Sequence, residues 1–318
     1  MLVASLLVVV GLVSLVGGGE LLVRGASGIA LASRVPAAVI GLTIVAVGTS
    51  LPELVVSVQS ALAGSPGLSM GNVVGSNIFN IGAILGIAAM VHPLAVVGTT
   101  LRLDWPVMMA AAVALVLMGQ DHALSQLEGG LLVGAIVVFT WYLLRVSRVE
   151  GSPADAQISG PPLEVRAVVR DVAAVAGGAL LLAGGSTALV KGAVVLAASA
   201  GVSDTVVGLT VVAAGTSTPE LATSLVAARR GQDDIAIANV VGSNIFNVLG
   251  ILGVVALIEP LPVVDEILRR DNWWMLGSSL LLLPLLWRGR LTRGGGALLF
   301  GVFSVYLGGL IWVALGLR

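Results

Sequence analysis

The segment NVVGSNIFN occurs twice in this chain, at residues 72–80 and 239–247, and the two copies are identical at every position. The same shift of 167 residues places GLTIVAVGTSLPEL of residues 41–54 on GLTVVAAGTSTPEL of residues 208–221 without a gap. A polar pattern duplicated in this way predicts that the chain consists of two homologous halves.

Apolar runs fill the sequence around these segments. Of the 318 residues, 57% are hydrophobic and 10% are charged, whereas about a quarter of a soluble domain is charged. A transmembrane helix needs roughly 20 apolar residues. Neither a buried soluble helix nor a cleaved signal peptide explains runs of this kind that recur along the whole chain. We therefore predict an all-α polytopic membrane protein with ten transmembrane helices, near residues 1–18, 36–61, 69–91, 105–119, 125–145, 168–190, 203–228, 235–258, 272–287 and 296–316.

The number of predicted helices in each half determines how the halves are related. Residues 1–145 hold the first five-helix repeat and residues 168–318 the second. Residues 146–167 between them contain the Gly, Pro and mixed charges of a flexible linker. Because five is odd, the second repeat is predicted to be inverted relative to the first. Transporters with inverted repeats bind substrate near the membrane midplane, on broken helices where the repeats meet.

Positive charges predict which side the loops face, because cytoplasmic loops carry an excess of Lys and Arg. With the N-terminus outside, four cationic residues face outward: Lys191, Arg269, Arg270 and Arg318. The others then face the cytoplasm: Arg24, Arg34, Arg102, Arg145, Arg148, Arg166, Arg170, Arg229, Arg230, Arg288, Arg290 and Arg293. We predict a multi-pass protein of the cell membrane with a cytoplasmic linker and both termini extracytoplasmic.

Composition also limits the partners. The formal net charge of −1 favours no nucleic-acid-binding face, and the absence of cysteine excludes disulfides and thiolate metal sites. His92 and His122 lie near predicted helix ends and form no pair of metal ligands. No cofactor and no protein partner can be inferred, which leaves the lipid bilayer and a small cargo.

The first polar segment brings hard oxygen atoms into an apolar helix. Four of its residues share one helix face by their spacing of i, i+3, i+4 and i+7: Ala46, Thr49, Ser50 and Glu53. Pro52 has no N–H, so the carbonyl of Gly48 loses its helical partner and the helix breaks there. We expect the backbone carbonyls near Ala46 to become free to bind a ligand.

The second polar segment continues this pattern. Asn72, Ser76 and Asn80 are spaced by four residues, so their oxygens also line one helix face. The second half repeats both segments with Ala213, Thr216, Ser217, Pro219, Glu220, Asn239, Ser243 and Asn247.

Glu53 and Glu220 are the acids placed deep in predicted helices. A charge at the bilayer centre costs roughly 2.5 kcal/mol or more, and an intramembrane acid is functional by default. No Lys or Arg is predicted at the same depth, so a cation is the expected partner. Oxygen ligands suit Ca²⁺, Na⁺ and Mg²⁺, and Mg²⁺ gives up its waters reluctantly. The flexible ligand set therefore favours Ca²⁺.

Several other polar residues have simpler interpretations. Packing between helices explains Thr43, Thr210, Asn77 and Asn244 as well as a ligand role does. Asn72 and Asn239 are expected to support packing or gating rather than to bind an ion. Asp104 and Asp271 directly precede apolar runs, which predicts helix N-caps. Glu20 and Arg24 form an i, i+4 pair that predicts an ion pair or an interfacial anchor.

The paired GTSxPE and GSNIFN segments resemble the calcium/cation antiporter superfamily, and within it the sodium/calcium exchanger family of prokaryotic type. The resemblance implies a secondary transporter rather than an enzyme, which exchanges Na⁺ for Ca²⁺ electrogenically by alternating access. It implies that the first and sixth helices slide as a gating pair. It assigns the central Ca²⁺ site to Glu53 and Glu220 with Thr49 and Thr216. It assigns flanking Na⁺ sites to Ala46, Ser50 and Ser76, and to Ala213, Ser217 and Ser243, with Asn80 and Asn247 in the middle.

Asn247 stands where some relatives carry an aspartate, so the predicted pocket has two formal negative charges. One Ca²⁺ or two Na⁺ would neutralise it, whereas three Na⁺ would leave a positive charge that a site of low dielectric resists. The number of Na⁺ per Ca²⁺ therefore stays open, and K⁺ co-transport is not favoured.

Three alternative functions are less consistent with the sequence. A Ca²⁺/H⁺ antiporter is the first, because burial disfavours the ionised form of a carboxyl group. Proton-coupled relatives, however, are expected to lack the Thr-Ser-x-Pro-Glu pattern that occurs twice here. A cation channel with an acidic constriction is the second, but one chain with two inverted halves favours alternating access. A membrane scaffold ranks last, because it leaves two buried acids unexplained.

Overall fold

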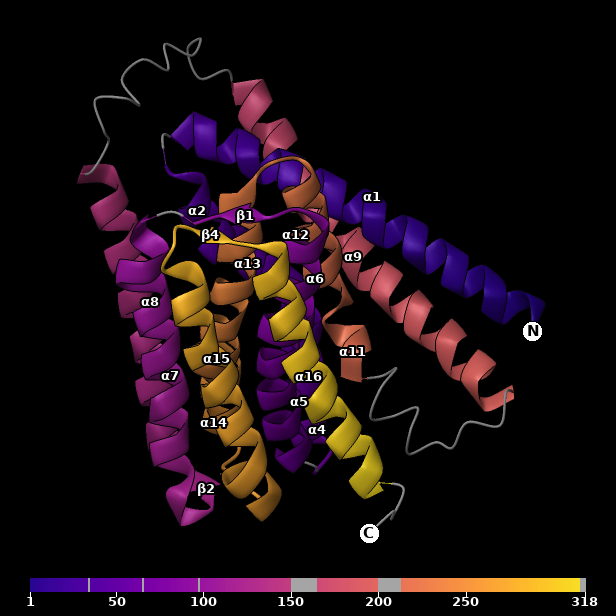
Figure 1. Ribbon diagram of the computed structural model, residues 1–318, viewed down its shortest axis with the longest axis vertical. Coiled ribbons are helices and arrows are strands. Elements are labelled where there is room, and N and C mark those ends of the chain that lie inside the picture. The colour runs from indigo at the N-terminus through magenta and orange to yellow at the C-terminus, as the bar shows by residue number, and fades with distance from the viewer. Residues whose placement is uncertain (34, 65, 97, 150–164, 200–212, 315–318) are drawn as a thin grey trace.

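The computed structural model describes residues 1–33, 35–64, 66–96, 98–149, 165–199 and 213–314, and these residues are almost entirely helical (Figure 1). Three parts of the prediction lie outside the described residues. They are most of the linker at 146–167, the segment GLTVV at 208–212 with Thr210, and the loop cations Arg34 and Arg318. The predicted all-α class is confirmed.

The first half begins with one long helix and continues with broken ones. Its elements are α1 (Leu2–Ser33), α2 (Ala37–Ile40), η1 (Gly41–Val45), α3 (Ala46–Thr49), α4 (Leu51–Leu62), α5 (Pro66–Phe79), η2 (Asn80–Leu85), α6 (Gly86–Val91), β1 (Leu94–Ala95), η3 (Thr100–Asp104), α7 (Trp105–Met118), η4 (Gly119–Asp121), β2 (Ala123–Leu124) and α8 (Gln126–Val149). Here η1, η2 and η3 are π-helical turns, and η4 is a 3₁₀ turn.

The second half repeats this order. Its elements are α9 (Val165–Ser199), α11 (Ala213–Thr216), α12 (Thr218–Arg229), α13 (Asp233–Ile245), η7 (Phe246–Leu252), α14 (Gly253–Ile258), β3 (Leu261–Pro262), η8 (Ile267–Asp271), α15 (Asn272–Leu286), β4 (Arg290–Leu291) and α16 (Arg293–Ala314). The turns η7 and η8 are π-helical, as their counterparts in the first half are.

The described helices account for seven or eight membrane spans by length and composition. Seven are long and apolar enough, and the bent pair 37–49 and 51–62 counts as an eighth if it is one span. The predicted helix near 203–228 corresponds to α11 and α12, and the one near 272–287 to α15. The count of ten therefore stays a prediction.

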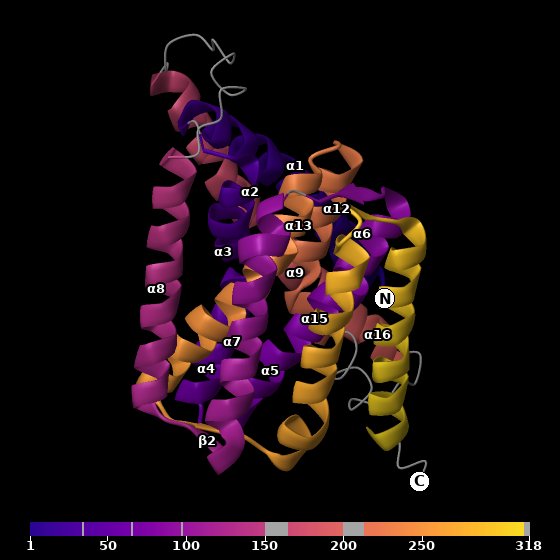
Figure 2. The ribbon, with the colours of Figure 1, turned by 60° about the vertical axis from the view of Figure 1, so that its left-hand side comes forward.

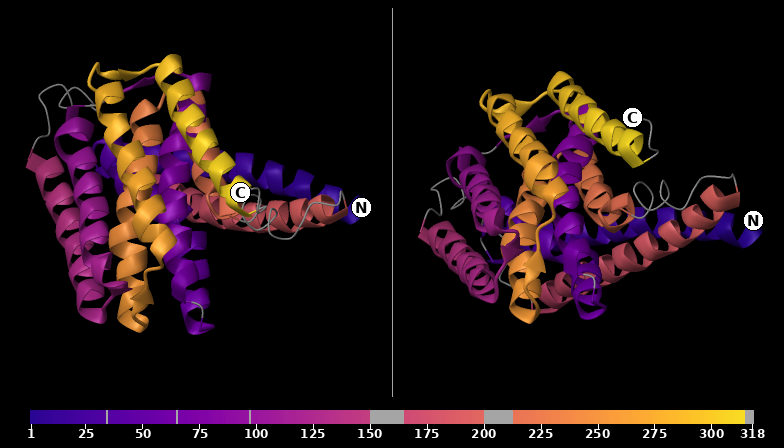
Figure 3. Two further views of the ribbon diagram at one scale, coloured as in Figure 1. Left: turned by 60° about the horizontal axis from the view of Figure 1, so that its bottom comes forward. Right: turned by 90° about the horizontal axis from the view of Figure 1, so that it is seen from below.

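Two predicted helices were too short. The first, at 1–18, continues to Ser33, and the sixth, at 168–190, extends over Val165–Ser199. Both helices lie obliquely to the upright bundle and extend beyond it on one side, as Figure 3 shows. An inclined helix needs more residues to cross the same thickness of bilayer, which explains the added length.

Two short sheets show that the halves are inverted. Each takes one strand from each half: β1 pairs with β4 and β2 pairs with β3, both antiparallel. The shift of 167 residues converts the pair Leu94↔Leu291 into the pair Leu261↔Leu124. The β1–β4 sheet lies at the top of Figure 1 and β2 lies at the bottom. The same feature thus occurs at opposite ends of the molecule, as inverted repeats require.

The α5–α6 and α13–α14 helices form the centre of the bundle. In both, 78% of the membrane-spanning window is buried, against 17–33% for the other long helices. Figure 2 shows α8 and α16 at the two sides, with α5 between them. The duplicated NVVGSNIFN segments therefore lie where protein surrounds them on all sides.

Candidate cation-binding site

Both predicted helix breaks are present. In the first half α3 ends at Thr49 and α4 begins at Leu51, with a bend of 45° at Ser50. Ser50 has φ −85° and ψ 7°, and its counterpart Ser217 has φ −89° and ψ 7°. In each half a proline near the start of the second helix cannot donate the next helical hydrogen bond. The break turns the polar side chains of the two GTSxPE segments toward the centre of the helix bundle.

The carbonyl of Ala46 is not free, contrary to the prediction from Pro52. It accepts the backbone N–H of Ser50 at 3.0 Å and the hydroxyl of Thr49 at 3.2 Å. The helix keeps its regular hydrogen bond as far as Ser50, and the side chain of Thr49 occupies the second lone pair. Ala213 in the second half lies at the edge of the described residues, as the first residue of α11.

Each glutamate is held by a serine of the other half. Ser50 Oγ donates to Glu220 Oε1 at 2.8 Å, and Ser217 Oγ donates to Glu53 Oε1 at 2.9 Å. Both glutamates are 1% exposed, and both serines are fully buried. The two predicted acids therefore lie in one cluster between the repeats.

Two further serines join this cluster. Ser243 Oγ lies 3.1 Å from Ser50 Oγ, and Ser76 Oγ lies 3.2 Å from Ser217 Oγ. The NVVGSNIFN segment of each half thus contacts the broken helix of the opposite half.

The asparagines form a second layer that also crosses between the halves. Asn77 and Asn244 each donate a side-chain N–H to the backbone carbonyl of the other, at 3.3 and 3.2 Å. Asn80 Nδ2 donates to Asn244 Oδ1 at 2.9 Å, and Asn247 Nδ2 donates to Asn77 Oδ1 at 3.0 Å. Asn77 and Asn244 therefore orient the amide groups of Asn80 and Asn247.

Four buried oxygens of this cluster have no hydrogen-bond donor among the described residues. They are Glu53 Oε2, Glu220 Oε2, Asn80 Oδ1 and Asn247 Oδ1. An acceptor buried without a partner costs about 1–3 kcal/mol, and more when it is charged. Two carboxylate and two amide oxygens form the hard donor set that Ca²⁺ and Na⁺ take. The residues present therefore fit a bound cation.

The supporting role expected for Asn72 and Asn239 agrees with their contacts. Asn72 Nδ2 donates to the carbonyl of Glu53 at 3.4 Å and Asn239 Nδ2 to that of Glu220 at 3.4 Å. Asn239 Oδ1 lies 3.2 Å from Thr49 Oγ1. These amides hold the glutamate-bearing turns. Thr216, the counterpart of Thr49, is partly buried at the end of α11.

Asp104 and Asp271 are not the helix N-caps that their positions predicted. Both have helical backbone angles and make no capping hydrogen bond, because the π-helical turns η3 and η8 begin earlier. Asp271 contacts Arg270 at 2.7 Å and accepts a hydrogen bond from Tyr306 at 3.2 Å. Asp104 is 1% exposed, and neither carboxylate oxygen has a hydrogen-bond partner in the described part of the chain. It is a further buried acid that sequence position alone did not distinguish.

Two inverted halves that each place a broken helix, a carboxylate and an amide around one buried oxygen cluster define an inverted-repeat membrane transporter. The sodium/calcium exchanger protein family matches residues 3–145 and 171–312, and the chain belongs to this family. The resemblance inferred from the paired segments is thereby confirmed.

Named relatives match over nearly their full length. The inner membrane protein YrbG of Escherichia coli (strain K12) is 34% identical, over 99% of this chain and 98% of its own. The sodium/calcium exchanger MaX1 of Methanosarcina acetivorans is 32% identical, over 97% and 98%. Among solved structures, the sodium-calcium exchanger NCX_Mj is 29% identical, with a TM-score of 0.84 over 97% of this chain and 99% of that one.

Proposed function

We propose that this protein exchanges Na⁺ for Ca²⁺ across the cell membrane by alternating access, with the ions bound at the oxygen cluster between the repeats. The observation that carries the proposal is the pair of buried glutamates, each with one oxygen that has no donor among the described residues. A transported cation supplies the missing partner. The exchanger names of MaX1 and NCX_Mj agree with this function.

We assign Ca²⁺ to the centre of the cluster. Its ligands are the orphaned oxygens of the two glutamates, Asn80 and Asn247, with oxygen from Thr49 and Thr216. The resemblance grouped Ser50 with Ser76 and Ser217 with Ser243, but Ser50 lies beside Ser243 and Ser76 lies beside Ser217. We therefore assign one flanking Na⁺ site to Ser50 and Ser243 and the other to Ser76 and Ser217, with the backbone carbonyls of Ala46 and Ala213 as further ligands. For Ala46 to bind Na⁺, Thr49 must turn its hydroxyl away from that carbonyl.

Competition for shared ligands couples the two ions. Ser50 and Ser217 each donate to a glutamate of the opposite half. A Ca²⁺ ion attracts both carboxylates at once, whereas Na⁺ ions divide the same oxygens among separate sites. The pocket then holds one kind of cargo at a time, which an antiporter requires.

We infer that α1 and α9 form the gate and move as one unit. A Cβ added at Gly18 of α1 would lie 2.9 Å from the carbonyl oxygen of Gly178 in α9, and one at Gly185 would lie 2.9 Å from Ser14 Cβ. Backbones this close are typical of membrane helices joined through small residues. Sliding of this pair past the bundle would open the cluster to one side and then to the other.

A Ca²⁺/H⁺ antiporter is the second candidate. The observation that favours it is the same pair of unpaired carboxylate oxygens, because each could carry a proton instead of contacting Na⁺. The neutral Asn80 and Asn247 leave the pocket with two formal negative charges, which two protons or two Na⁺ would neutralise equally well.

Uptake of ⁴⁵Ca²⁺ into proteoliposomes separates these candidates. The vesicles are loaded with Na⁺, the outside is free of Na⁺, and valinomycin with K⁺ sets the voltage. We expect uptake that needs internal Na⁺ and rises with inside-positive potential, which means more than two Na⁺ per Ca²⁺. Uptake that needs internal Na⁺ but does not depend on voltage would indicate two Na⁺ per Ca²⁺. Uptake that ignores Na⁺ and follows a pH gradient would overturn the Na⁺ proposal.

A further inference from the structure

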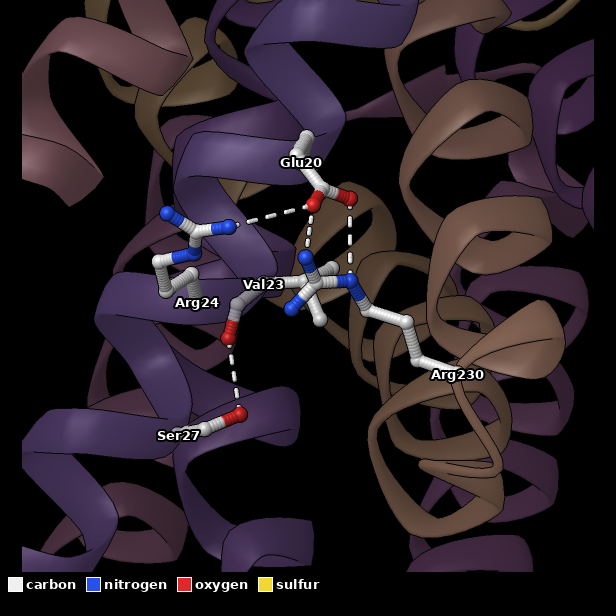
Figure 4. Close-up of polar contacts among 5 residues, drawn as sticks. All are labelled: Glu20, Val23, Arg24, Ser27 and Arg230. Atoms are coloured by element: carbon white, nitrogen blue, oxygen red, sulfur yellow. Dashed lines mark hydrogen bonds and ion pairs between the residues drawn. The ribbon is translucent and has the colours of Figure 1, made fainter.

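A cavity of about 550 Å³ lies between α1, α9 and the turn that connects α12 to α13. This volume is within the range of small-molecule pockets, roughly 300–1,000 Å³. The cavity is separate from the oxygen cluster and shares no residue with it. Figure 4 shows part of its edge, where Arg230 reaches from the end of α12 toward Glu20 on α1.

The lining of this cavity is cationic. It contains three guanidinium groups, of Arg24, Arg170 and Arg230, and one carboxylate, of Asp171. Glu20 adds a second carboxylate at the edge and binds Arg230 through both of its oxygens. Counting both acids, the surroundings keep one unpaired positive charge, so a ligand of this cavity is an anion.

Two of the arginines keep donors available. The guanidinium of Arg24 contacts Glu20 through one nitrogen, at 3.5 Å, as Figure 4 shows. The side chain of Arg24 is 66% exposed. Arg170 directs Nε and one Nη to a single oxygen of Asp171, at 3.1 Å each, and its side chain is 76% exposed. A guanidinium has five N–H donors in a planar fork that matches phosphate oxygens. Phosphate is therefore the favoured anion.

The rest of the lining indicates that the phosphate is attached to a lipid. Leu21, Leu31 and Ala174 contribute apolar surface beside the arginines, and Leu31 is 64% exposed. A free phosphate ion gains nothing from apolar contacts, whereas a phospholipid has a chain to place there. Basic pockets between helices on the cytoplasmic side are a known way to bind lipid headgroups, and the predicted orientation places all three arginines on that side.

The inverted repeat shows that the fold does not require this cavity's charges. The 167-residue shift keeps one of the three cations, as Lys191, and replaces the other two with Val3 and Ala63. The same shift keeps both glutamates and all serines and asparagines of the oxygen cluster unchanged. The cluster of three cations thus belongs to one end of the molecule only, as expected for a site that binds a ligand of one membrane leaflet.

We propose that this cavity binds the phosphate group of an anionic phospholipid through Arg24, Arg170 and Arg230. The purified full-length protein would be titrated with phosphatidylglycerol and, separately, with phosphatidylcholine of the same acyl chains. Bound lipid would be measured by native mass spectrometry. We expect phosphatidylglycerol to bind preferentially, and the double variant R24Q/R170Q to bind it about tenfold more weakly, because two charge-assisted contacts are lost.

A matched control keeps the test specific. R102Q/R288Q removes two charges from exposed arginines that do not line the cavity, so its affinity for phosphatidylglycerol should stay at the wild-type value. An equal loss in both double variants, or equal binding of the two lipids, would overturn the site. If R24Q/R170Q fails to fold, R170Q alone carries the test, because within the described part of the chain the guanidinium of Arg170 pairs with its sequence neighbour Asp171.

Inorganic phosphate distinguishes the source of the anion. Added in excess, it should leave the bound phosphatidylglycerol in place, because it lacks the apolar contacts. If free phosphate displaces the lipid from the wild type, the cavity binds a soluble anion and the lipid assignment is wrong. None of these measurements depends on transport, so they stand apart from the test of Na⁺/Ca²⁺ exchange.

Discussion

Glu53 and Glu220 come from segments far apart in the sequence and are buried in the same oxygen cluster. Each has one carboxylate oxygen that accepts a hydrogen bond from a serine and one without a partner among the described residues. Glu53→Gln or Glu220→Gln removes one of the two charges that attract Ca²⁺. We expect ⁴⁵Ca²⁺ uptake to fall about 100-fold or more, because breaking a buried charge interaction costs roughly 3–5 kcal/mol.

The same substitutions should not harm folding. A neutral amide is cheaper to bury than an uncompensated carboxylate, so the melting temperature of ion-free protein should be equal or higher. Ser278→Ala is a control that should transport normally, because this buried serine donates to the carbonyl of Met275 in its own helix. Normal uptake by either glutamine variant would show that the glutamates do not bind the transported ion.

Asp104 and Asp271 allow a comparison between repeat-related acids. Asp271 is paired with Arg270 and Tyr306, whereas Asp104 is buried with no hydrogen bond in the described chain. We expect Asp104→Asn to raise the free energy of unfolding by about 1 kcal/mol or more, and Asp271→Asn to lower it by a similar amount. Thermal unfolding in detergent measures both. A larger loss for Asp104→Asn would reveal a partner that stabilises its carboxylate.

Spacing along the chain predicted much of the oxygen cluster. Helical periodicity places Thr49, Ser50 and Glu53 on one face whatever the tertiary structure is. It cannot predict which helix that face meets, so the bonds from Ser50 to Glu220, across 170 residues, were beyond it. For the same reason the spacing could not decide whether Asn77 packs against a helix or binds an ion. It also did not show that the carbonyl of Ala46 already accepts a hydrogen bond from Thr49.

At the scale of elements, α1 and α9 differ from the other helices in their length and inclination (Figure 3). Their length was mispredicted because Glu20 and Arg24 interrupt the apolar run of α1, although the helix continues through them. Their seam of glycines brings backbone against backbone, whereas Gly19 of α1 faces α12 of the bundle. One surface of α1 therefore meets α9, its partner in the proposed gate, and another meets α12, past which it would slide.

Disulfides can test this division, because the chain has no cysteine of its own. A Cβ added at Gly19 would lie 3.3 Å from the backbone of Ala222, close enough for Gly19→Cys with Ala222→Cys to be cross-linked. We expect oxidation of this pair to reduce ⁴⁵Ca²⁺ uptake to background and reduction to restore it. The single variants Gly19→Cys and Ala222→Cys are the controls, and under the same oxidising conditions they should keep their uptake because neither can form the link. Full activity of the oxidised Gly19–Ala222 link would exclude sliding of α1 along α12.

At the scale of the whole molecule, the two small sheets tie the halves together at opposite ends. They have two-residue strands that no propensity argument predicts, yet the repeat relates one sheet to the other residue by residue. Inversion itself followed from an odd number of predicted helices. The ends of the helices were predicted less well from the sequence. The π-helical turns and the inclination of the long helices add residues that a hydropathy pattern does not show.

The predicted orientation can be checked at these two ends. Arg290 in β4 lies at the end with the predicted cytoplasmic linker, and Asp265, whose side chain is 57% exposed, lies at the other end beside β3. In intact cells we expect a membrane-impermeant maleimide to label Asp265→Cys and to leave Arg290→Cys unlabelled until the membrane is opened. The excess of arginines at the Arg290 end is the physical reason, because positively charged loops stay in the cytoplasm. Labelling of both variants from outside would contradict the inverted topology, and the reverse pattern would show that the whole molecule is inserted the other way up.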